Sequence, residues 1–414
     1  MPRGAVLVTT ATAVVLAVLF ESGGLALQQP PARPRWTTAW GTSQQTLGTT
    51  TVTDATLRLI ARVTIPGEAV RIRLDHTFGT DPLVVGKAYV GLRIQGATLA
   101  AGSNRQVFFG GLPGVTIPPG GSVTSDPVPL RVLGRQDLGV SLYVPGSGVR
   151  PSQHSAAHVT SYLTANGAGD EAAGEAGEPF GLTATSMPWL KAIDVESASS
   201  PGSIVAFGDS ITDGTCSTLD AHDRWEDWLS VRLALDAAGT PSAPRAVVNE
   251  GIGGNTVTRE RLQPPPDSTP GLERLERDVL THAGVTHVVL FMGTNDIRRG
   301  APAAQVIAGM QDIIGRVKAR GLKIVGVTII PRHNRAPVPN NSGWNPTKTR
   351  IRNEVNRWIR TAAPFDAVID FDTVVHDPEH GDLLRPAFDC GDGIHPSPRG
   401  YYEMGVSVPL GFFR

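Results

Sequence analysis

Five short apolar runs alternate with segments of helix length in the second half of the chain. Runs of this kind, rich in Val and Ile and flanked by helical segments, are typical of buried strands in a doubly wound parallel sheet. The pattern therefore predicts an α/β region whose parallel sheet has five strands. The runs are residues 204–207, 246–248, 287–292, 323–330 and 367–371.

The first half of the chain has a different rhythm, in which apolar and polar residues alternate. Val70, Ile72 and Leu74 are separated by arginines, and residues 140–144 repeat the alternation. A period of two indicates half-buried strands, and Pro-Gly pairs supply turns between them. Because no convincing helical window occurs in this half, residues 36–165 are predicted to form an all-β sandwich or jelly roll.

The length of the chain suits this division into two regions, because 414 residues exceed one domain of ordinary size. Residues 166–180 are rich in Gly, Ala and Glu, a composition typical of a flexible linker or surface loop. We therefore assign residues 166–200 to a linker and residues 201–414 to the α/β domain.

The amino terminus resembles an export signal. Arg3 precedes an apolar run from residue 5 to residue 20, and Gly24 and Ala26 are small residues of the kind found at signal-peptide cleavage sites. A membrane anchor is the alternative, but threonines interrupt the run, which is shorter than the ~20 apolar residues of a spanning helix. We predict a signal peptide over residues 1–26, a secreted mature protein and no membrane span after cleavage.

The charge balance argues against a nucleic-acid partner. Lys and Arg total 37 against 38 for Asp and Glu, which leaves a formal net charge of -1. No basic stripe or long run of like charge occurs, so the electrostatic signature of a nucleic-acid surface is missing from the sequence. A small polar or neutral ligand fits this composition better, and the sequence leaves the oligomeric state open.

Four short motifs follow the predicted strands. The first three begin where an apolar run ends, and the fourth lies beyond the fifth run, just before the last helical stretch. The carboxyl ends of parallel strands meet at one edge of a sheet, where ligands bind, so these motifs are expected to converge. They are residues 208–210 (Gly-Asp-Ser), 253–255 (Gly-Gly-Asn), 293–296 (Gly-Thr-Asn-Asp) and 392–395 (Asp-Gly-Ile-His).

Ser210 is the candidate nucleophile. It follows a strand and a glycine and is predicted to open a helix, where its own N–H and the positive end of the helix dipole can face a developing oxyanion. A serine at a helix start also serves as an ordinary N-cap, so the position alone leaves both readings open. Asp209 is interpreted as a structural acceptor that holds the turn.

Asp392 and His395 stand three residues apart on a turn rich in Gly and Pro. This spacing lets the carboxylate accept from one imidazole nitrogen while the other nitrogen points outward, which fixes the tautomer that a general base needs. The alternative is a loop aspartate that caps the last helix beside a solvated histidine. Together with Ser210, the pair would complete a catalytic triad.

Gly254 and Asn295 are the candidates for the rest of an oxyanion hole. Gly254 offers a backbone N–H without a side chain in the way, and Asn295 offers its side-chain amide. A turn glycine and an asparagine bonded to nearby backbone are the simpler readings of these residues. Their joint placement at one edge of one sheet favours the functional reading.

These four motifs closely resemble the blocks of the SGNH (GDSL) hydrolase family. Residues 208–210 match its nucleophile block, Gly254 within 249–256 its glycine block, 293–296 its asparagine block and 392–395 its Asp-x-x-His block, all in order. The resemblance covers residues 203–412 and implies a three-layer α/β/α, flavodoxin-like fold. It also implies the triad Ser210, His395 and Asp392, with oxyanion donors from Ser210, Gly254 and Asn295. Residues 40–42 and 78–80 resemble the β region that precedes this domain in some exported bacterial members.

The chain has two cysteines, Cys216 and Cys390, which lie close in sequence to Ser210 and Asp392 respectively. If the two flanking loops meet at one site, the sulfurs are brought together, and an exported protein meets an oxidising compartment. We predict a disulfide between them. Two unconnected small core residues are the alternative.

The predicted chemistry is ester hydrolysis through a Ser-His-Asp triad and an acyl-enzyme, which requires neither metal nor cofactor. Short-chain or carbohydrate-linked acyl esters are the expected substrates. A lipase or phospholipase, an acyltransferase and a carbohydrate-binding protein remain alternatives. Trp344, with His333, could wall a pocket or stack on a sugar ring, or it could pack on the next helix, whereas Trp225 and Trp228 are interpreted as core residues.

Overall fold

The computed structural model describes residues 1–2, 4, 36–240, 244–332 and 343–414. The predicted signal peptide, residues 1–26, therefore lies almost entirely outside the described residues. Among those that are described, no helix combines the length and the apolar character needed to cross a membrane.

The second half of the chain contains the predicted parallel sheet. Its five strands all run parallel, in the order β18-β17-β19-β20-β21. Each predicted apolar run falls on one strand, because a parallel strand covered on both faces needs apolar side chains on both. The strands are β17 (Ser203–Gly208), β18 (Ala246–Gly251), β19 (Val285–Phe291), β20 (Lys323–Val327) and β21 (Ala367–Ile369).

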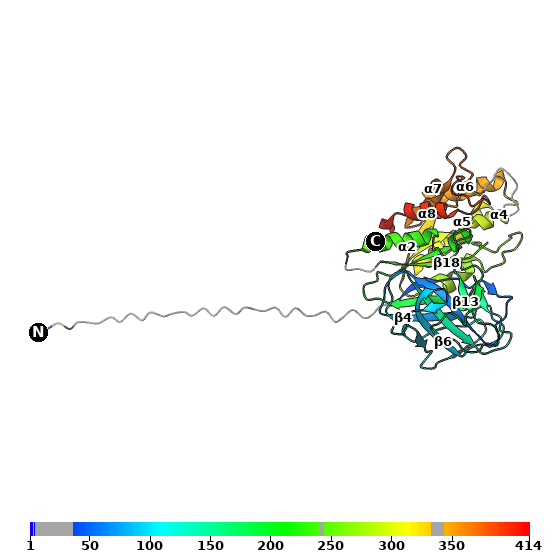
Figure 1. Cartoon of the computed structure of the whole chain (residues 1–414). Coiled ribbons are helices and arrows are strands. Elements are labelled where there is room, and N and C mark those ends of the chain that lie inside the picture. Colours follow the sequence, from blue (N-terminus) through cyan, green and yellow to red (C-terminus); the bar gives the residue numbers. More distant parts are fainter. Residues whose placement is uncertain (3, 5–35, 241–243, 333–342) are drawn as a thin grey trace. The chain divides into compact units, whose positions relative to one another are not determined.

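Helices cover both faces of this sheet. Val205 and Phe207 of β17 join the core formed with α5 and α6, whereas Ile204 and Ala206 join the core formed with α2 and α8. Because successive side chains of a strand point to opposite faces, this partition confirms the three-layer α/β/α fold. Figure 1 labels α2, α5, α6 and α8 in this part of the chain. The helices are α1 (Ser210–Asp213), α2 (Trp225–Ala237), α3 (Gly271–Leu275), η1 (Glu276–Leu280), α4 (Thr294–Arg298), α5 (Ala303–Ala319), α6 (Pro346–Thr361), α7 (Phe371–Val375), α8 (Pro398–Ser407) and η3 (Leu410–Phe413).

Of the two tryptophans of α2 predicted to be core residues, Trp225 belongs to the hydrophobic core and Trp228 is only partly buried. Trp225 is fully buried and meets Phe371 edge to face. Trp228 packs in the same way against Tyr402 of α8. Both rings therefore hold α2 against neighbouring helices and are not available as a binding platform.

The first half of the chain is all-β, and its strands pair antiparallel throughout. A four-stranded sheet has the order β1-β16-β4-β10, and a larger sheet has the order β14-β13-β3-β11-β6-β7, with β8 paired to β6. The strands of the first sheet are β1 (Trp36–Gly41), β4 (Ala69–Asp75), β10 (Ser122–Thr124) and β16 (Leu190–Glu196). Those of the second are β3 (Ala55–Val63), β6 (Lys87–Gln95), β7 (Thr98–Leu99), β8 (Arg105–Val107), β11 (Gln136–Val144), β13 (Ser161–Leu163) and β14 (Leu182–Ala184). Two small sheets contain β2 (Thr46–Leu47), β12 (Ser152–His154) and β15 (Met187–Pro188), and β5 (Leu83–Val85) with β9 (Val115–Ile117).

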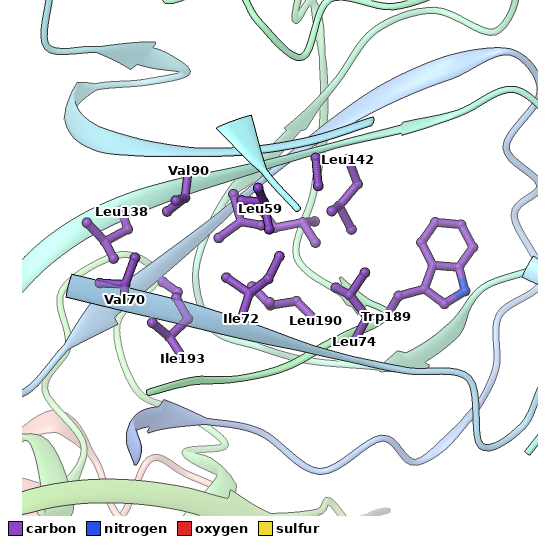
Figure 2. Close-up of a cluster of buried hydrophobic side chains, with 14 of the residues drawn as sticks. Leu59, Val70, Ile72, Leu74, Val90, Leu138, Leu142, Trp189, Leu190 and Ile193 are labelled. Atoms are coloured by element: carbon purple, nitrogen blue, oxygen red, sulfur yellow. The ribbon is translucent and has the colours of Figure 1, made fainter. Parts of the chain in front are cut away.

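The two larger sheets share one hydrophobic core, which Figure 2 shows in close-up. Leu59 and Leu142 belong to the larger sheet, while Ile72 and Ile193 belong to the four-stranded sheet. All four are fully buried, and the alternation of apolar residues predicted for β4 and β11 is what brings such side chains to one face. The predicted all-β region is thus confirmed as sheets packed on a common core.

The predicted linker over residues 166–200 is wrong in its second half. Residues 182–196 form strands β14, β15 and β16, and β16 lies between β1 and β4. The Gly- and Ala-rich composition that suggested a linker ends near residue 180, whereas 190–196 is a central strand with buried side chains. Even the Gly-rich part is tied down, because the Arg58 guanidinium donates to the carbonyls of Gly174 and Ala176.

Candidate active site

Ser210 is the first residue of α1. Asp209 alone separates it from Gly208, the last residue of β17. Asp209 caps this helix by accepting from the Ile211 N–H at 3.1 Å. Gly208 is required for this turn, because a Cβ there would lie 2.1 Å from Thr212 Oγ1 and 2.8 Å from the Phe291 carbonyl oxygen. Burial raises the pKa of Asp209 to about 6, against the opposing effect of the Ile211 N–H. Asp209 therefore has the structural role expected of it.

The structure brings Asp392 and His395 to Ser210. Ser210 Oγ lies 2.8 Å from His395 Nε2, and His395 Nδ1 lies 2.6 Å from Asp392 Oδ2. The second carboxylate oxygen, Oδ1, accepts from the backbone N–H groups of Ile394 and His395 at 2.8 and 2.9 Å. Burial alone would raise the pKa of Asp392, but the hydrogen bonds and charge of its partners outweigh burial and lower it to about 2. The carboxylate thus stays ionised and orients the imidazole.

Gly254 and Asn295 line the same open pocket as Ser210 and His395, a space of about 460 Å³. Gly254 has φ 71°, a left-handed conformation that favours glycine and sets the direction of its N–H. The Asn295 amide nitrogen donates to the Asn255 carbonyl oxygen at 3.0 Å. This bond uses one of its two hydrogens, so the other can still serve a ligand. The other lining residues are Thr215, Gly253, Arg298, Arg332, Asp392 and Ile394.

A buried arginine that sequence reasoning missed supports two of these loops from below. Arg274 of α3 donates to the Gly208 carbonyl oxygen at 2.8 Å and to Asn255 Oδ1 at 3.0 Å. It also donates to Ser43 of the β region at 2.8 Å. The side chain is fully buried, and burial lowers its pKa to about 10 despite the opposing charges nearby. Arg274 therefore ties the nucleophile turn and the glycine loop together.

The β region also contributes a charged side chain to a buried cluster beneath the site, next to Arg274. Lys191 of β16 lies 2.8 Å from Glu250 at the end of β18 and 2.9 Å from Asp278 of η1. All three side chains are almost completely buried, so each charge depends on the others for its solvation. No sequence motif could have found this set, because its members come from three separate elements.

A second histidine–carboxylate pair lies at the other end of α1. His154 Nε2 is 2.9 Å from Asp213 Oδ1, and Asp213 Oδ2 accepts from the Gly253 N–H at 2.9 Å. Gly253 immediately precedes Gly254, so this carboxylate fixes the loop that carries a candidate oxyanion donor. The sequence carried no signal for the pair, since its members are 59 residues apart and belong to different regions.

The structure contains the disulfide between Cys216 and Cys390, whose Cα atoms are 6.3 Å apart. It joins the loop after α1 to the turn that carries Asp392. Two groups among the described residues have metal-ligand spacing, Cys216 with Asp392 and His395, and Asp389 with Cys390 and Asp392. Each includes a sulfur that is engaged in the disulfide.

Trp344 follows the packing alternative. Its Nε1 donates to Thr349 Oγ1 of α6 at 3.1 Å, and Arg332 lies over its ring at 5.7 Å from the centroid. His333, the other residue proposed to wall the pocket, lies outside the described residues. The indole thus braces Arg332 and α6.

Comparisons with known proteins agree with the sequence motifs. Residues 206–402 match the model of the GDSL-like Lipase/Acylhydrolase family. A search of curated proteins found no match.

The solved structures that match part of this chain include two esterases and a lipolytic protein. A carbohydrate acetylesterase from Sinorhizobium meliloti is 19% identical, with a TM-score of 0.40, over 51% of this chain and 99% of its own. An aryl esterase from M. smegmatis is 22% identical, with a TM-score of 0.39, over 49% and 94%. A member of the lipolytic G-D-S-L family from Veillonella parvula is 21% identical, with a TM-score of 0.34, over 51% and 98%. Residues 206–402, just under half of the chain, thus form a region that matches the GDSL-like lipase/acylhydrolase family.

Proposed function

We propose that this chain is a serine esterase that hydrolyses carboxylic esters of short acyl groups through Ser210, His395 and Asp392. The observation that carries the proposal is the continuous line of contacts from Ser210 Oγ through the His395 imidazole to the Asp392 carboxylate, at 2.8 and 2.6 Å. A nucleophile, a base and a group that orients the base are thus within hydrogen-bond reach of one another beside an open pocket.

The first half-reaction forms an acyl-enzyme. Ser210 Oγ attacks the ester carbonyl carbon while its proton passes to His395 Nε2. The carbonyl oxygen becomes an oxyanion, which accepts from the N–H groups of Ser210 and Gly254 and from the Asn295 amide. The C–O bond to the alcohol then breaks, and the alcohol leaves with the proton from His395.

The second half-reaction repeats these steps with water. His395 takes a proton from water as the oxygen attacks the acyl carbon, and the same donors hold the second oxyanion. Collapse of this intermediate returns the proton to Ser210 Oγ and releases the carboxylic acid. Asp392 stays ionised throughout, since its lowered pKa of about 2 keeps it negative while His395 carries the proton.

We also propose that the protein acts outside the cell. The apolar amino-terminal run of the sequence supports export, and a disulfide next to the site suits an oxidising compartment. The mass of the protein recovered from culture medium tests this, because removal of residues 1–26 and of two hydrogens from the cysteines changes it by a calculable amount.

Labelling with a fluorophosphonate probe, combined with hydrolysis of a series of nitrophenyl esters, tests the proposed role of Ser210. Ser210→Ala should lose the label and lower kcat by about 10⁴-fold or more. Ser217→Ala, which changes a serine in the loop after α1, is the matched control and should keep both. Equal labelling of wild type and Ser210→Ala would contradict the assignment. Product analysis with added alcohols then separates hydrolysis from acyl transfer.

A further inference from the structure

The pocket beside Ser210 has a cationic wall. Arg298 of α4 and Arg332 after β20 both line it, and Asp392 is the single carboxylate among its described lining residues. That carboxylate is engaged with His395 at 2.6 Å. The pocket surface that the structure describes thus carries two guanidinium groups and one carboxylate, which already serves His395.

Arg298 differs sharply from its sequence neighbour Arg299. The Arg299 guanidinium is buried and donates to the carbonyls of Pro264 and Pro265 at 2.8 and 2.6 Å. Arg298, in contrast, has no side-chain hydrogen bond or ion pair with any described residue, and its Nε is buried without a partner. Arg299 therefore holds the loop that contains Pro264 and Pro265. The N–H donors of the Arg298 guanidinium, in contrast, remain for a ligand in the pocket.

Arg332 is held in place by Asn295, a candidate oxyanion donor, and by the neighbouring Thr294. Its Nη1 donates to Thr294 Oγ1 at 3.3 Å and to Asn295 Oδ1 at 3.2 Å. Burial and the charge of Arg298 lower its pKa to about 10, so it remains positive near neutral pH. A fixed, desolvated cation next to Asn295 strengthens the attraction of this wall for negative charge.

The immediate surroundings add positive charge. Lys348 Nζ donates to the Arg298 carbonyl oxygen at 2.7 Å, which places an ammonium group beside the same helix end. Burial and the charges of Arg298 and Arg332 lower the pKa of Lys348. An anion at this wall would relieve the repulsion among three neighbouring cations, and a carboxylate or phosphate matches the fork of a guanidinium in a bidentate way.

Polar and charged residues make up most of the described lining of the pocket. Ile394 is the one purely hydrocarbon side chain among the described residues that line it. The wall thus offers several hydrogen-bonding groups to a polar substrate.

We propose that the substrate is an ester bearing a carboxylate or phosphate group, which Arg298 binds while Ser210 attacks the carbonyl. This inference rests on the proposed esterase function and names its substrate class. Arg298 is assigned as the specificity-determining residue. Arg332 acts as a positioning residue for Asn295 and adds to the positive field.

Matched esters that differ only in charge test the proposal. On the alcohol side, 4-acetoxybenzoate is compared with 4-acetoxybenzamide. On the acyl side, the mono-4-nitrophenyl ester of succinic acid is compared with that of succinamic acid, with the enzyme-free rate subtracted. The wild type should show a higher kcat/KM for the anionic member of at least one pair, and the pair that shows it tells on which side of the ester the anion lies.

The ratio of kcat/KM for anionic and neutral esters is the readout in variants. Arg298→Ala should lower this ratio by about 10-fold or more, the effect of removing one charge-assisted hydrogen bond, and Arg298→Lys should lower it less. Arg357→Ala, which removes the same charge from the exposed face of α6, is the control and should leave the ratio unchanged. Added salt should reduce the wild-type ratio, since it screens charge on an open pocket.

The outcomes separate this inference from the proposed function. If wild type is labelled at Ser210 and hydrolyses neutral esters but shows no anionic preference in either pair, the inference is overturned and the esterase assignment stands. If no ester is hydrolysed and Ser210 is not labelled, the proposed function itself fails. Should Arg298→Ala not fold, the wild-type ratio and its dependence on salt still decide.

Discussion

The four-residue helix α1 has a histidine–carboxylate pair at each end, and the two pairs differ in what faces the second imidazole nitrogen. At its start, His395 has Asp392 on Nδ1 and the Ser210 hydroxyl on Nε2. A hydroxyl can donate its proton, so Nε2 can accept one. At its end, His154 contacts Asp213 through Nε2 at 2.9 Å, as described above.

The hydrogen-bond partners of His154 among the described residues are all acceptors. Its Nδ1 lies 2.8 Å from the Ser43 carbonyl oxygen, and its Nε2 also lies 3.2 Å from the Ala156 carbonyl oxygen. Both nitrogens must donate to satisfy these partners, which is the pattern of the imidazolium form. Burial opposes that charge, but Asp213 and the two carbonyls outweigh burial and raise the pKa of His154.

The comparison shows that a histidine–carboxylate pair is not in itself catalytic. The side chains of His395 and Asp392 are 14% and 18% exposed, whereas those of His154 and Asp213 are 2% and 6% exposed. The first pair has a nucleophile and access to a ligand. The second has no hydroxyl on its other imidazole nitrogen, and its carboxylate instead holds the Gly253 N–H. We therefore expect substitutions to affect rate in the first pair and stability in the second.

The largest effect is expected at His395. His395→Ala removes the base while leaving the surrounding backbone largely in place, so kcat should fall by about 10⁴-fold. The melting temperature should change little, because the ring is partly exposed and serves no buried network. Steady-state kinetics on a neutral ester, with thermal melts of both proteins, provide the check. A variant that keeps most of its activity would contradict the role of His395 as base.

The next largest effect is expected for the buried pair of His154 and Asp213, where a substitution should lower the free energy of unfolding. Asp213→Asn places an amide where both His154 and the Gly253 N–H need an acceptor, and it breaks a buried ion pair. Such a break costs about 3–5 kcal/mol. Denaturant unfolding measures this loss. His158→Gln is the control, because His158 Nε2 is 4.0 Å from the same carboxylate oxygen and forms no hydrogen bond with it. Equal losses in both variants would mean that the His154 contact contributes nothing specific.

The sequence revealed the first pair and not the second for a physical reason. Asp392 and His395 share one turn, so their spacing alone places them within reach of each other. The five strands could also be predicted from the sequence, because a strand that is buried on both faces consists of a continuous run of apolar residues. The edge of the sheet then brought Ser210 and His395 together from 185 residues apart.

The remainder of the site depends on how the β region packs on the parallel sheet. Contacts such as Lys191 with Glu250 and Arg274 with Ser43 cross between the two regions. The hydrophobic periodicity of one region does not show which of its residues will face the other region. A charged residue that becomes buried between them therefore cannot be told from a surface charge in the sequence. The central strand β16 was missed for a related reason, since composition near residue 170 says nothing about pairing at 190–196.

A substitution at Asn295 tests how this residue contributes to the rate. It can do so by contacting the substrate carbonyl oxygen directly or by supporting the neighbouring loops. Asn295→Ala should lower kcat by about 100 to 1000-fold if its free amide hydrogen reaches the oxyanion. KM should change little, because the donor acts on charge that develops after binding. Thr294→Ala is a suitable comparison, as it removes the neighbouring hydroxyl contact to Arg332 and leaves the amide. An Asn295→Ala enzyme with wild-type kcat would show that the Asn295 contact to the Asn255 carbonyl is purely structural.

The smallest and most diagnostic effect is the pH dependence of stability that His154 confers. A histidine whose folded pKa is raised stabilises the fold fully below its unfolded value of about 6.5. That contribution is lost as pH rises through the folded value, with a slope of at most about 1.4 kcal/mol per pH unit. His154→Gln removes the titration, so the difference in unfolding free energy between wild type and His154→Gln should shrink from pH 6 upward. Measuring the difference cancels all other titrating groups that the two proteins share. A difference that stays constant up to pH 9, or grows, would mean that His154 is neutral in the folded state, and the contrast between the two ends of α1 would then rest on exposure alone.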